Sequence, residues 1–137
     1  MQILVGSCLC RSVRYEAEGP LLRVARCHCA QCRKASGAEF ATNGSVRADR
    51  FRVVAGVELL SEFESSPGQA RVFCSRCGSH LFARKRASEQ ADMVRLRLGC
   101  LDCEIEQRPL CHVFVSRRPE WSEITDDLPQ FDTIPLT

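Results

Sequence analysis

The stretch CHCAQC, residues 27–32, places three thiols and one imidazole in six positions. One residue separates Cys27 from Cys29, and Cys32 follows three positions later. Thiols clustered at such short spacings are typical of metal ligands. The stretch therefore suggests that a metal ion organises this part of the chain, and the other cysteines have to be considered with it.

The chain has ten cysteines in 137 residues, and two more clusters lie in GSCLC (6–10) and FCSRCG (73–78). The start, MQILVGSCLC, lacks the basic residues and long apolar core of a secretory signal, so we expect a cytoplasmic protein with reduced thiols. Metal ligation is then favoured over a disulfide framework, and buried thiols without a metal are the third interpretation. No stretch approaches the roughly 20 apolar residues of a membrane span, so we expect no membrane partner.

Two of the clusters can combine into one closed site. In an extended strand, residues i and i+2 face the same side, which allows Cys8 and Cys10 to reach one ion. Cys74 and Cys77 precede Gly78, which can adopt the positive φ of a tight turn that presents two thiolates. Structural zinc is almost always four-coordinate, so the sequence predicts one structural zinc site with four cysteine ligands from these two pairs. Such a site would link distant parts of the chain and stabilise the fold.

Cys27, Cys29 and Cys32 are then left as three thiolates in one short loop. Three protein ligands with an open fourth position are typical of a catalytic zinc. The alternative is that a fourth protein ligand closes this site as well. In either case the expected cofactor is Zn²⁺, with two ions per chain.

The three histidines are the first candidates for a fourth ligand or a catalytic group. An extended chain turns His28 away from the face that carries its two neighbouring cysteines. His80 and His112 are distant in sequence, and both alternatives stay open. His28, which lies beside the metal ligands, is the candidate general acid.

Other residues carry weaker signals. Cys100, Cys103 and Cys111, with His112, could form a third metal site, but Glu104 replaces the glycine expected after the second cysteine, and packed thiols are favoured. Two basic pairs could bind a substrate carboxylate, although a solvated surface is the default interpretation: Arg33 with Lys34, and Arg117 with Arg118. Trp121 is expected in the rim or the core.

Alternation with period two, typical of half-buried strands, recurs along the chain. MVRLRLG (93–99) is the clearest example, with Val94 and Leu96 set against Arg95 and Arg97. Further strands are expected at 12–19, 21–29, 51–56, 57–63, 69–74, 80–84 and 111–115. We expect a mainly β fold of short antiparallel strands.

Fewer signals indicate turns and helices. SSPGQ (65–69) has the proline and glycine of a turn between two strands. AQCRKAS (30–36), which ends before Gly37, is the expected short helix. The segment 126–137 is expected to lie along the surface without forming an element.

The charge gives no indication of a polyanionic partner. Lys and Arg number 19 against 17 Asp and Glu, which gives a formal charge of +2. Zinc–thiolate sites would lower this value, because bound thiolates are negative. We therefore expect no nucleic-acid partner.

The order of GSCLCRSVRYE, CHCAQCRKASGAEF, FCSRCGSHLF, LGCLD and HVFVSRRPEW resembles the glutathione-dependent formaldehyde-activating enzyme family, which includes centromere protein V. The resemblance implies a single-domain β-tent fold over 1–137, with a core at about 6–121 and a tail at 122–137. It assigns Cys8, Cys10, Cys74 and Cys77 to a structural zinc, and Cys27, Cys29 and Cys32 to a catalytic zinc. It also implies addition of glutathione to formaldehyde.

The sequence departs from the family pattern in two places. Arg11 and Ser12 stand where the family usually has glycine and a small residue. Cys100 and Cys103 lie in a segment that does not normally carry this pair.

The leading functional hypothesis is a zinc-dependent carbon–sulfur lyase whose substrates are a small-molecule thiol and an aldehyde. The alternative from another class is a zinc-stabilised binding module without catalysis. A thiol-redox protein would need a reversible disulfide and thiols of low pKa, and bound zinc would suppress that chemistry.

Overall fold

The computed structural model describes residues 2–86 and 92–134. The strands are β1 (Ile3–Ser7), β2 (Arg14–Glu18), β3 (Leu22–Cys27), β4 (Ala41–Arg47), β5 (Phe51–Ala55), β6 (Leu60–Ser66), β7 (Gln69–Cys74), β8 (His80–Lys85), β9 (Met93–Arg97) and β10 (Cys111–Val113). The α-helix is α1 (Ala30–Ser36), and short 3-10 helices are η1 (Ala48–Arg50), η2 (Val57–Leu59), η3 (Leu98–Cys100) and η4 (Val115–Arg117). The described chain is thus a small, mainly β domain, as the alternation predicts.

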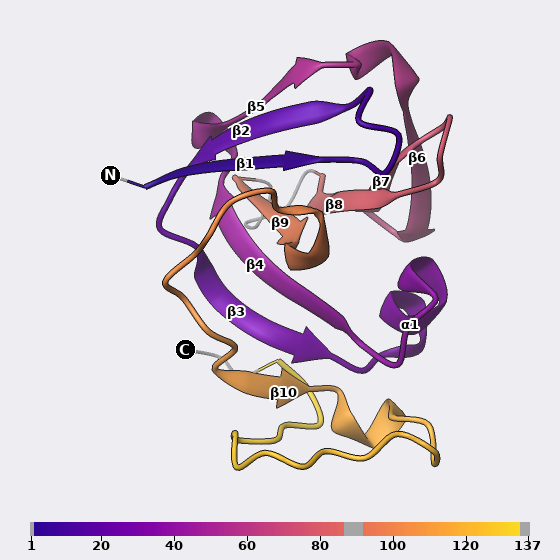
Figure 1. Ribbon diagram of the computed structural model, residues 1–137. Helices are drawn as coiled ribbons and strands as arrows, with labels where there is room; N and C mark the ends of the chain where they lie inside the picture. Colours follow the sequence, from indigo (N-terminus) through magenta and orange to yellow (C-terminus); the bar gives the residue numbers. More distant parts are fainter. Residues whose placement is uncertain (1, 87–91, 135–137) are drawn as a thin grey trace.

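The strands form two open sheets that pack against each other (Figure 1). The smaller sheet has the order β1-β2-β5, and the larger has the order β10-β3-β4-β9-β8-β7-β6. All neighbouring strands are antiparallel except β10, which runs parallel to β3. The expectation of antiparallel strands is therefore confirmed, with β10 as the exception.

The main core lies between the two sheets. Tyr15 of β2 packs against Phe51 of β5, with ring centroids 5.3 Å apart, and Phe51 packs edge-on against Phe82 of β8 at 4.8 Å. Leu4 of the small sheet and Leu96 of the large sheet are fully buried in the same cluster. Buried aromatic and aliphatic side chains of this kind hold the sheets together through the hydrophobic effect.

The other face of the large sheet is polar. Directly opposed residues of antiparallel strands lie on one face, so the register defines a row across four strands. This row contains Ser45, Arg95, Ala83 and Arg71, and the neighbouring pair joins Asn43 to Arg97. The arginines of MVRLRLG thus lie on the side away from the core.

The expected helix and turn are confirmed. Helix α1 covers the predicted residues and ends at Gly37, whose φ is 67° and whose N–H donates to the carbonyl of Arg33. The turn between β6 and β7 contains Pro67 and Gly68. The segment 126–134 forms no helix or longer strand, and only an isolated bridge joins Gln130 to His112. Residues 135–137 lie outside the described residues.

Several strands differ from the sequence-based prediction. β1 and β4 were not predicted, because neither has a clear apolar–polar alternation. The expected strand at 57–63 begins with the 3-10 helix η2, so β6 starts only at Leu60. The expected strand at 111–115 ends early, because Phe114 has a φ of 56°.

Gly78 provides a test of the turn that follows β7. Its φ is 80°, and a Cβ at this position would meet no atom within 4 Å. Gly78→Ala should therefore destabilise the metal-loaded protein by about 1–2 kcal/mol through backbone strain alone. Gly99 is the matched control, because its surroundings are equally open and its φ is not in the left-handed region. Denaturant unfolding should show unchanged or slightly higher stability for Gly99→Ala, and equal stability of both variants would contradict this account.

Candidate metal centres

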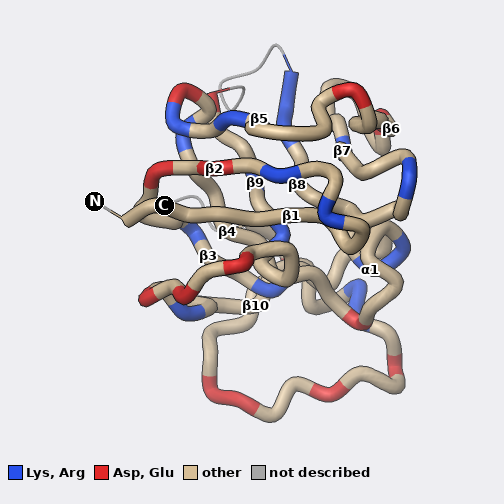
Figure 2. The backbone as a smooth tube through the Cα atoms, turned by 45° about the horizontal axis from the view of Figure 1, so that its top comes forward, with Lys and Arg blue, Asp and Glu red and all other residues tan. Residues whose placement is uncertain are grey.

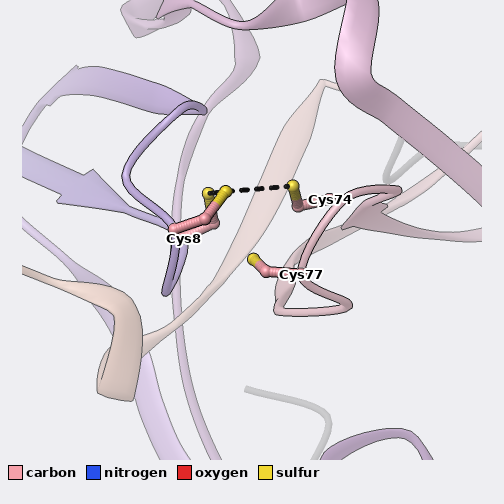
Figure 3. A group of neighbouring side chains, drawn as sticks. Cys8, Cys74 and Cys77 are labelled. Carbon is pink, nitrogen blue, oxygen red and sulfur yellow. Dashed lines mark hydrogen bonds between the residues drawn. The ribbon is translucent and has the colours of Figure 1, made fainter.

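Four cysteines from the two sheets meet at one point. Cys8 and Cys10 lie in the turn after β1, Cys74 ends β7, and Cys77 lies in the turn before β8. Their sulfurs all lie within 4.8 Å of one another, with 3.6 Å between Cys8 and Cys10 and 3.9 Å between Cys10 and Cys74. Figure 3 shows the labelled Cys8, Cys74 and Cys77 side chains pointing toward one another. Zn–S bonds of about 2.3 Å in a tetrahedron separate sulfurs by about 3.8 Å, so this group fits a zinc ion.

Backbone hydrogen bonds shape the two turns of this four-cysteine group. The Gly78 N–H donates to the Cys74 carbonyl at 2.8 Å, and the Cys74 N–H donates to the Ser79 carbonyl at 3.0 Å. The Leu9 N–H donates to the Ser79 hydroxyl oxygen, which joins the turn of the small sheet to that of the large one. The Ser79 hydroxyl also lowers the pKa of Cys77 to about 5. The local geometry thus favours a thiolate at Cys77, whereas burial raises the pKa of Cys8 to about 11.

The second group consists of the three thiols of CHCAQC. Cys27 ends β3, Cys29 caps the N-terminus of α1, and Cys32 lies in its first turn. The Cys29 sulfur accepts a hydrogen bond from the Cys32 N–H at 3.3 Å, and the three sulfurs lie within 4.8 Å of one another. The change from strand to helix within this stretch is therefore what brings the three thiols together.

Two arginines of the large sheet face this three-cysteine group. Arg71 Nη1 lies 3.9 Å from the Cys32 sulfur, and its other nitrogens donate to Ser65 Oγ and Gln31 Oε1. The pKa of Cys32 is lowered, first because Cys27 and Cys29 donate to its sulfur and then because Arg97 and Arg71 are close. Donation to the Cys29 and Cys32 sulfurs, followed by burial, raises the pKa of Cys27 instead. Cys32 therefore deprotonates before Cys27.

Among residues 2–86 and 92–134, no further Cys, His, Asp or Glu side chain joins the three-cysteine group. His80 Nδ1 accepts a hydrogen bond from Arg97 Nε at 3.4 Å. Burial, followed by the charges of Arg97 and Arg71, lowers the pKa of His80 to about 3, so this ring is neutral at physiological pH. Both ring nitrogens of His112 are engaged elsewhere. Neither histidine serves as a fourth ligand in this arrangement.

His28 lies in a buried chain of hydrogen bonds. Its Nε2 is 2.8 Å from His112 Nδ1, and His112 Nε2 is 3.0 Å from both carboxylate oxygens of Asp126. Arg26 forms an ion pair with the same carboxylate at 3.0 Å. The His28 ring packs against Phe40 and is 1% exposed. As the extended backbone predicts, His28 turns away from the side on which its neighbouring cysteines lie.

A cavity of about 1000 Å³ opens beside the three-cysteine group. Cys27, Cys29 and Cys32 line it, whereas His28 is not among the lining residues. The polar face of the large sheet forms its floor, and residues of the C-terminal segment form an apolar wall, among them Phe131 and Ile134. The three-cysteine group therefore borders the cavity, and Cys29 is more exposed than the buried Cys27 and Cys32.

The remaining sequence candidates are dispersed. Cys100 and Cys103 belong to neither metal group, and they contact the His80 carbonyl and the Val5 N–H respectively, which fits packed thiols. Cys111 lines the cavity wall without a metal partner among the described residues. Trp121 is 71% exposed, so it is a surface residue.

The basic pairs noted in the sequence play a limited part. Arg117 lines the cavity, whereas Arg118 donates to the Ser122 carbonyl, and neither Arg33 nor Lys34 reaches the lining. Other arginines line the cavity floor, among them Arg71 of β7 and Arg95 of β9. The sequence signal for Arg95 is the alternation of β9, which puts basic residues opposite the core.

A family model described as glutathione-dependent formaldehyde-activating enzyme matches residues 3–117. The chain belongs to this family. A relative from Talaromyces marneffei, named "Putative glutathione-dependent formaldehyde-activating enzyme", is 30% identical over 114 residues. The match covers 80% of this chain, and the chain spans about 60% of the length of that curated relative. A crystal structure of a Rhodobacter sphaeroides protein is 25% identical and covers 74% of this chain and 91% of its own, with a TM-score of 0.61.

One departure from the family pattern has a visible structural consequence. Arg11, at a position where the family resemblance leads us to expect glycine, has a φ of 65°. Its N–H donates to the Cys8 carbonyl at 2.9 Å, so the turn that presents Cys8 and Cys10 is kept despite the strained backbone.

None of the described helices is both long and apolar enough to cross a membrane.

The two metal groups should differ in their effect on stability. Cys74 is fully buried and joins the two sheets, so Cys74→Ala should destabilise the protein by several kcal/mol or prevent folding. The ligands of the other group are close in sequence, so Cys29→Ala should fold and lose only part of the bound metal. Thermal unfolding and metal analysis provide the measurement. If Cys74→Ala were as stable as the unaltered protein, the four-cysteine group would not hold the sheets together.

The buried histidine chain makes a separate prediction. Asp126→Ala removes the partner of His112 Nε2 and leaves a buried polar atom unpaired, so the unfolding temperature should fall by several degrees. Asp127→Ala is the matched control, because Asp127 is exposed and makes no side-chain hydrogen bond with the described residues. Equal unfolding temperatures for the two variants would show that the hydrogen bond between His112 and Asp126 contributes nothing to stability.

Proposed function

We propose that the protein is a zinc-dependent carbon–sulfur lyase that adds a small thiol, such as glutathione, to an aldehyde such as formaldehyde, or catalyses the reverse cleavage. The observation that carries the proposal is the three-cysteine group on the wall of a cavity, without a fourth protein ligand among the described residues. Membership of the formaldehyde-activating enzyme family supports it. We also propose two zinc ions per chain, one in each cysteine group.

The two groups would differ in role. Cys8, Cys10, Cys74 and Cys77 would hold a structural zinc, because four sulfurs complete its coordination. Cys27, Cys29 and Cys32 would hold the catalytic zinc. At such a site the metal supplies stabilisation of a bound thiolate near neutral pH.

The chain's own residues have three tasks in this proposal. The cavity brings thiol and aldehyde together and removes much of their water, which turns a bimolecular encounter into a positioned reaction. The thiol sulfur bonds to the carbonyl carbon, the C=O π electrons move to oxygen, and the thiol proton ends on that oxygen. Arg71, which lines the cavity, and Arg97, which lines a neighbouring pocket, both lie near Cys32 and stabilise negative charge at its sulfur.

His28 is better suited to positioning than to proton transfer in this proposal. Its ring lies outside the cavity lining, and its backbone N–H donates to the Val113 carbonyl at 3.0 Å. Together with the hydrogen bond to His112, these contacts hold the backbone between Cys27 and Cys29. A protein group that delivers a proton to the carbonyl oxygen is not assigned.

A zinc-stabilised binding module is the alternative from another class. It would be expected to present a broad surface of one charge to its partner. Figure 2 shows instead both signs along the backbone, with acidic positions on the long loop that follows β10. The experiment below separates the two functions.

Thiol binding to the cobalt-substituted protein tests the proposal. Cobalt absorption reports the number of thiolate ligands, so glutathione should convert a three-sulfur spectrum into a four-sulfur spectrum. Cys29→Ala should abolish this response, whereas Cys103→Ala, a matched cysteine outside both metal groups, should keep it. A response to small thiols but not to glutathione would support the metal site and overturn the choice of glutathione. If no thiol changed the spectrum, the lyase proposal would fail and the binding module would be favoured.

A further inference from the structure

The floor of the cavity has a charge that the proposed reaction alone does not require. Six basic side chains line the cavity, and Asp132 is its only acidic lining residue among the described part of the chain. The basic residues are Arg23, Arg71, Arg84, Lys85, Arg95 and Arg117. Arg84 is ion-paired with Glu62, so the other five supply most of the positive charge. A concave site lined with one sign of charge attracts ligands of the opposite sign.

Three arginines lie near the three-cysteine group: Arg71 and Arg95 line the cavity, and Arg97, which lines a neighbouring smaller pocket, is also close to Cys32. Arg71 and Arg97 are 7% and 6% exposed, and within the described residues no carboxylate lies within 4.0 Å of Arg71, Arg95 or Arg97. Burying a guanidinium is costly unless a negative group compensates its charge. The neutral partners Asn43, Gln31 and Ser65 position two of these groups but do not neutralise them.

The protein's own sulfurs provide only part of the missing negative charge. Zinc held by three thiolates carries one negative charge, whereas the three arginines carry three positive charges. A bound substrate thiolate adds a second negative charge, and one positive charge is still uncompensated.

The position of Arg95 makes it the residue best placed to meet a ligand. It lies between Ser45 and Ala83 in the row across the sheet, and it lines the cavity without a carboxylate partner. Arg71, its neighbour two strands away, is already held by Gln31 and Ser65. Ser45 and Ala83, its small neighbours in this row, line the same cavity.

The apolar wall indicates the rest of the ligand. Apolar side chains also line the cavity, in contrast to the arginines of its floor. They are Leu110, Val113, Phe114, Phe131 and Ile134. An aliphatic segment can pack on such a wall while a charged end reaches the floor. The cavity therefore fits a molecule with an apolar middle and an anionic end.

We propose that the thiol substrate carries a carboxylate that binds Arg95 on the cavity floor while its sulfur lies at the three-cysteine group. The position of the sulfur in this inference rests on the proposed function. The carboxylate contact rests instead on the cavity, on the strand register that places Arg95 in its floor, and on the basic side chains that line it. Carboxylate-bearing thiols are then the preferred substrate class over neutral or cationic thiols.

Three short thiols that differ mainly in charge test the proposal on the cobalt-substituted protein. They are 3-mercaptopropionate, 2-mercaptoethanol and cysteamine, and their dissociation constants are taken from the cobalt spectrum. A charge-assisted hydrogen bond should make 3-mercaptopropionate bind about tenfold or more tightly than 2-mercaptoethanol, and cysteamine should bind weakest. Arg95→Gln should remove the preference for the carboxylate, so that 3-mercaptopropionate and 2-mercaptoethanol bind it with similar affinity. The preference is taken as the ratio of the two dissociation constants within each protein, so differences in thiol pKa cancel when the proteins are compared.

Two further variants serve as controls. Arg14→Gln makes the same change of charge on the exposed face of β2, and it should keep the preference for 3-mercaptopropionate. Arg95→Lys retains the charge and should restore part of the preference, which a purely structural role would not explain. If Arg14→Gln lost the preference as Arg95→Gln does, a general charge effect would replace the Arg95 contact.

Propionate, which has no thiol, separates this proposal from the proposed function. Calorimetry should show propionate binding to the unaltered protein, weakened at high ionic strength, and this measurement does not depend on the folding of any variant. If propionate binds and no thiol changes the cobalt spectrum, the carboxylate site stands and the lyase proposal fails. If all three thiols bind equally well and propionate does not bind, the lyase proposal stands and the carboxylate site is overturned.

Discussion

The convergence of Cys8 and Cys10 with Cys74 and Cys77 is the constraint on which the rest of the structure depends. It joins the turn that ends β1 in the small sheet to the turn between β7 and β8 in the large one. With the sheets held at this point, Tyr15, Phe51 and Phe82 can pack between them. The core then occupies one face of the large sheet and leaves the other face for a cavity.

The alternation within β9 connects this core to the chemistry of the cavity. Val94 and Leu96 are buried against the small sheet, while Arg95 and Arg97 point to the opposite face. A strand that supports the fold on one side therefore supplies charge on the other. Since side chains alternate with period two, a shift of register by one residue would exchange the two sets and remove both the core contacts and the basic floor.

Local patterns predicted much of this structure. The cysteine spacings, the Gly78 turn and the short helix before Gly37 depend on residues close in sequence, and the structure contains the expected cysteine groups, turn and helix. β4 was missed because its sequence, ATNGSVR, does not alternate between apolar and polar residues. Asn43, Gly44 and Ser45 follow one another in the strand, and all three are buried. Whether this segment forms a strand depends on its pairing with β3 and β9, and no local pattern in the sequence predicts that pairing.

The candidate site also combines features that local patterns predict with features that depend on distant parts of the chain. Alternation showed that Arg95 faces away from Leu96, but it could not show that this face lines a cavity rather than open solvent. That outcome depends on the C-terminal segment, which covers the sheet from residues far away in the chain. The contact of His28 with His112 likewise requires the parallel pairing of β10 with β3.

The apolar wall of the cavity affects how this chain can be compared with its relatives. The family model ends at residue 117, whereas Pro129, Phe131 and Ile134 of the cavity wall lie beyond it. Mutations there would alter the shape of the cavity without touching a cysteine of either metal group. Two chains with the same cysteines can therefore differ in the shape of this cavity, and the shared cysteines alone would not distinguish them.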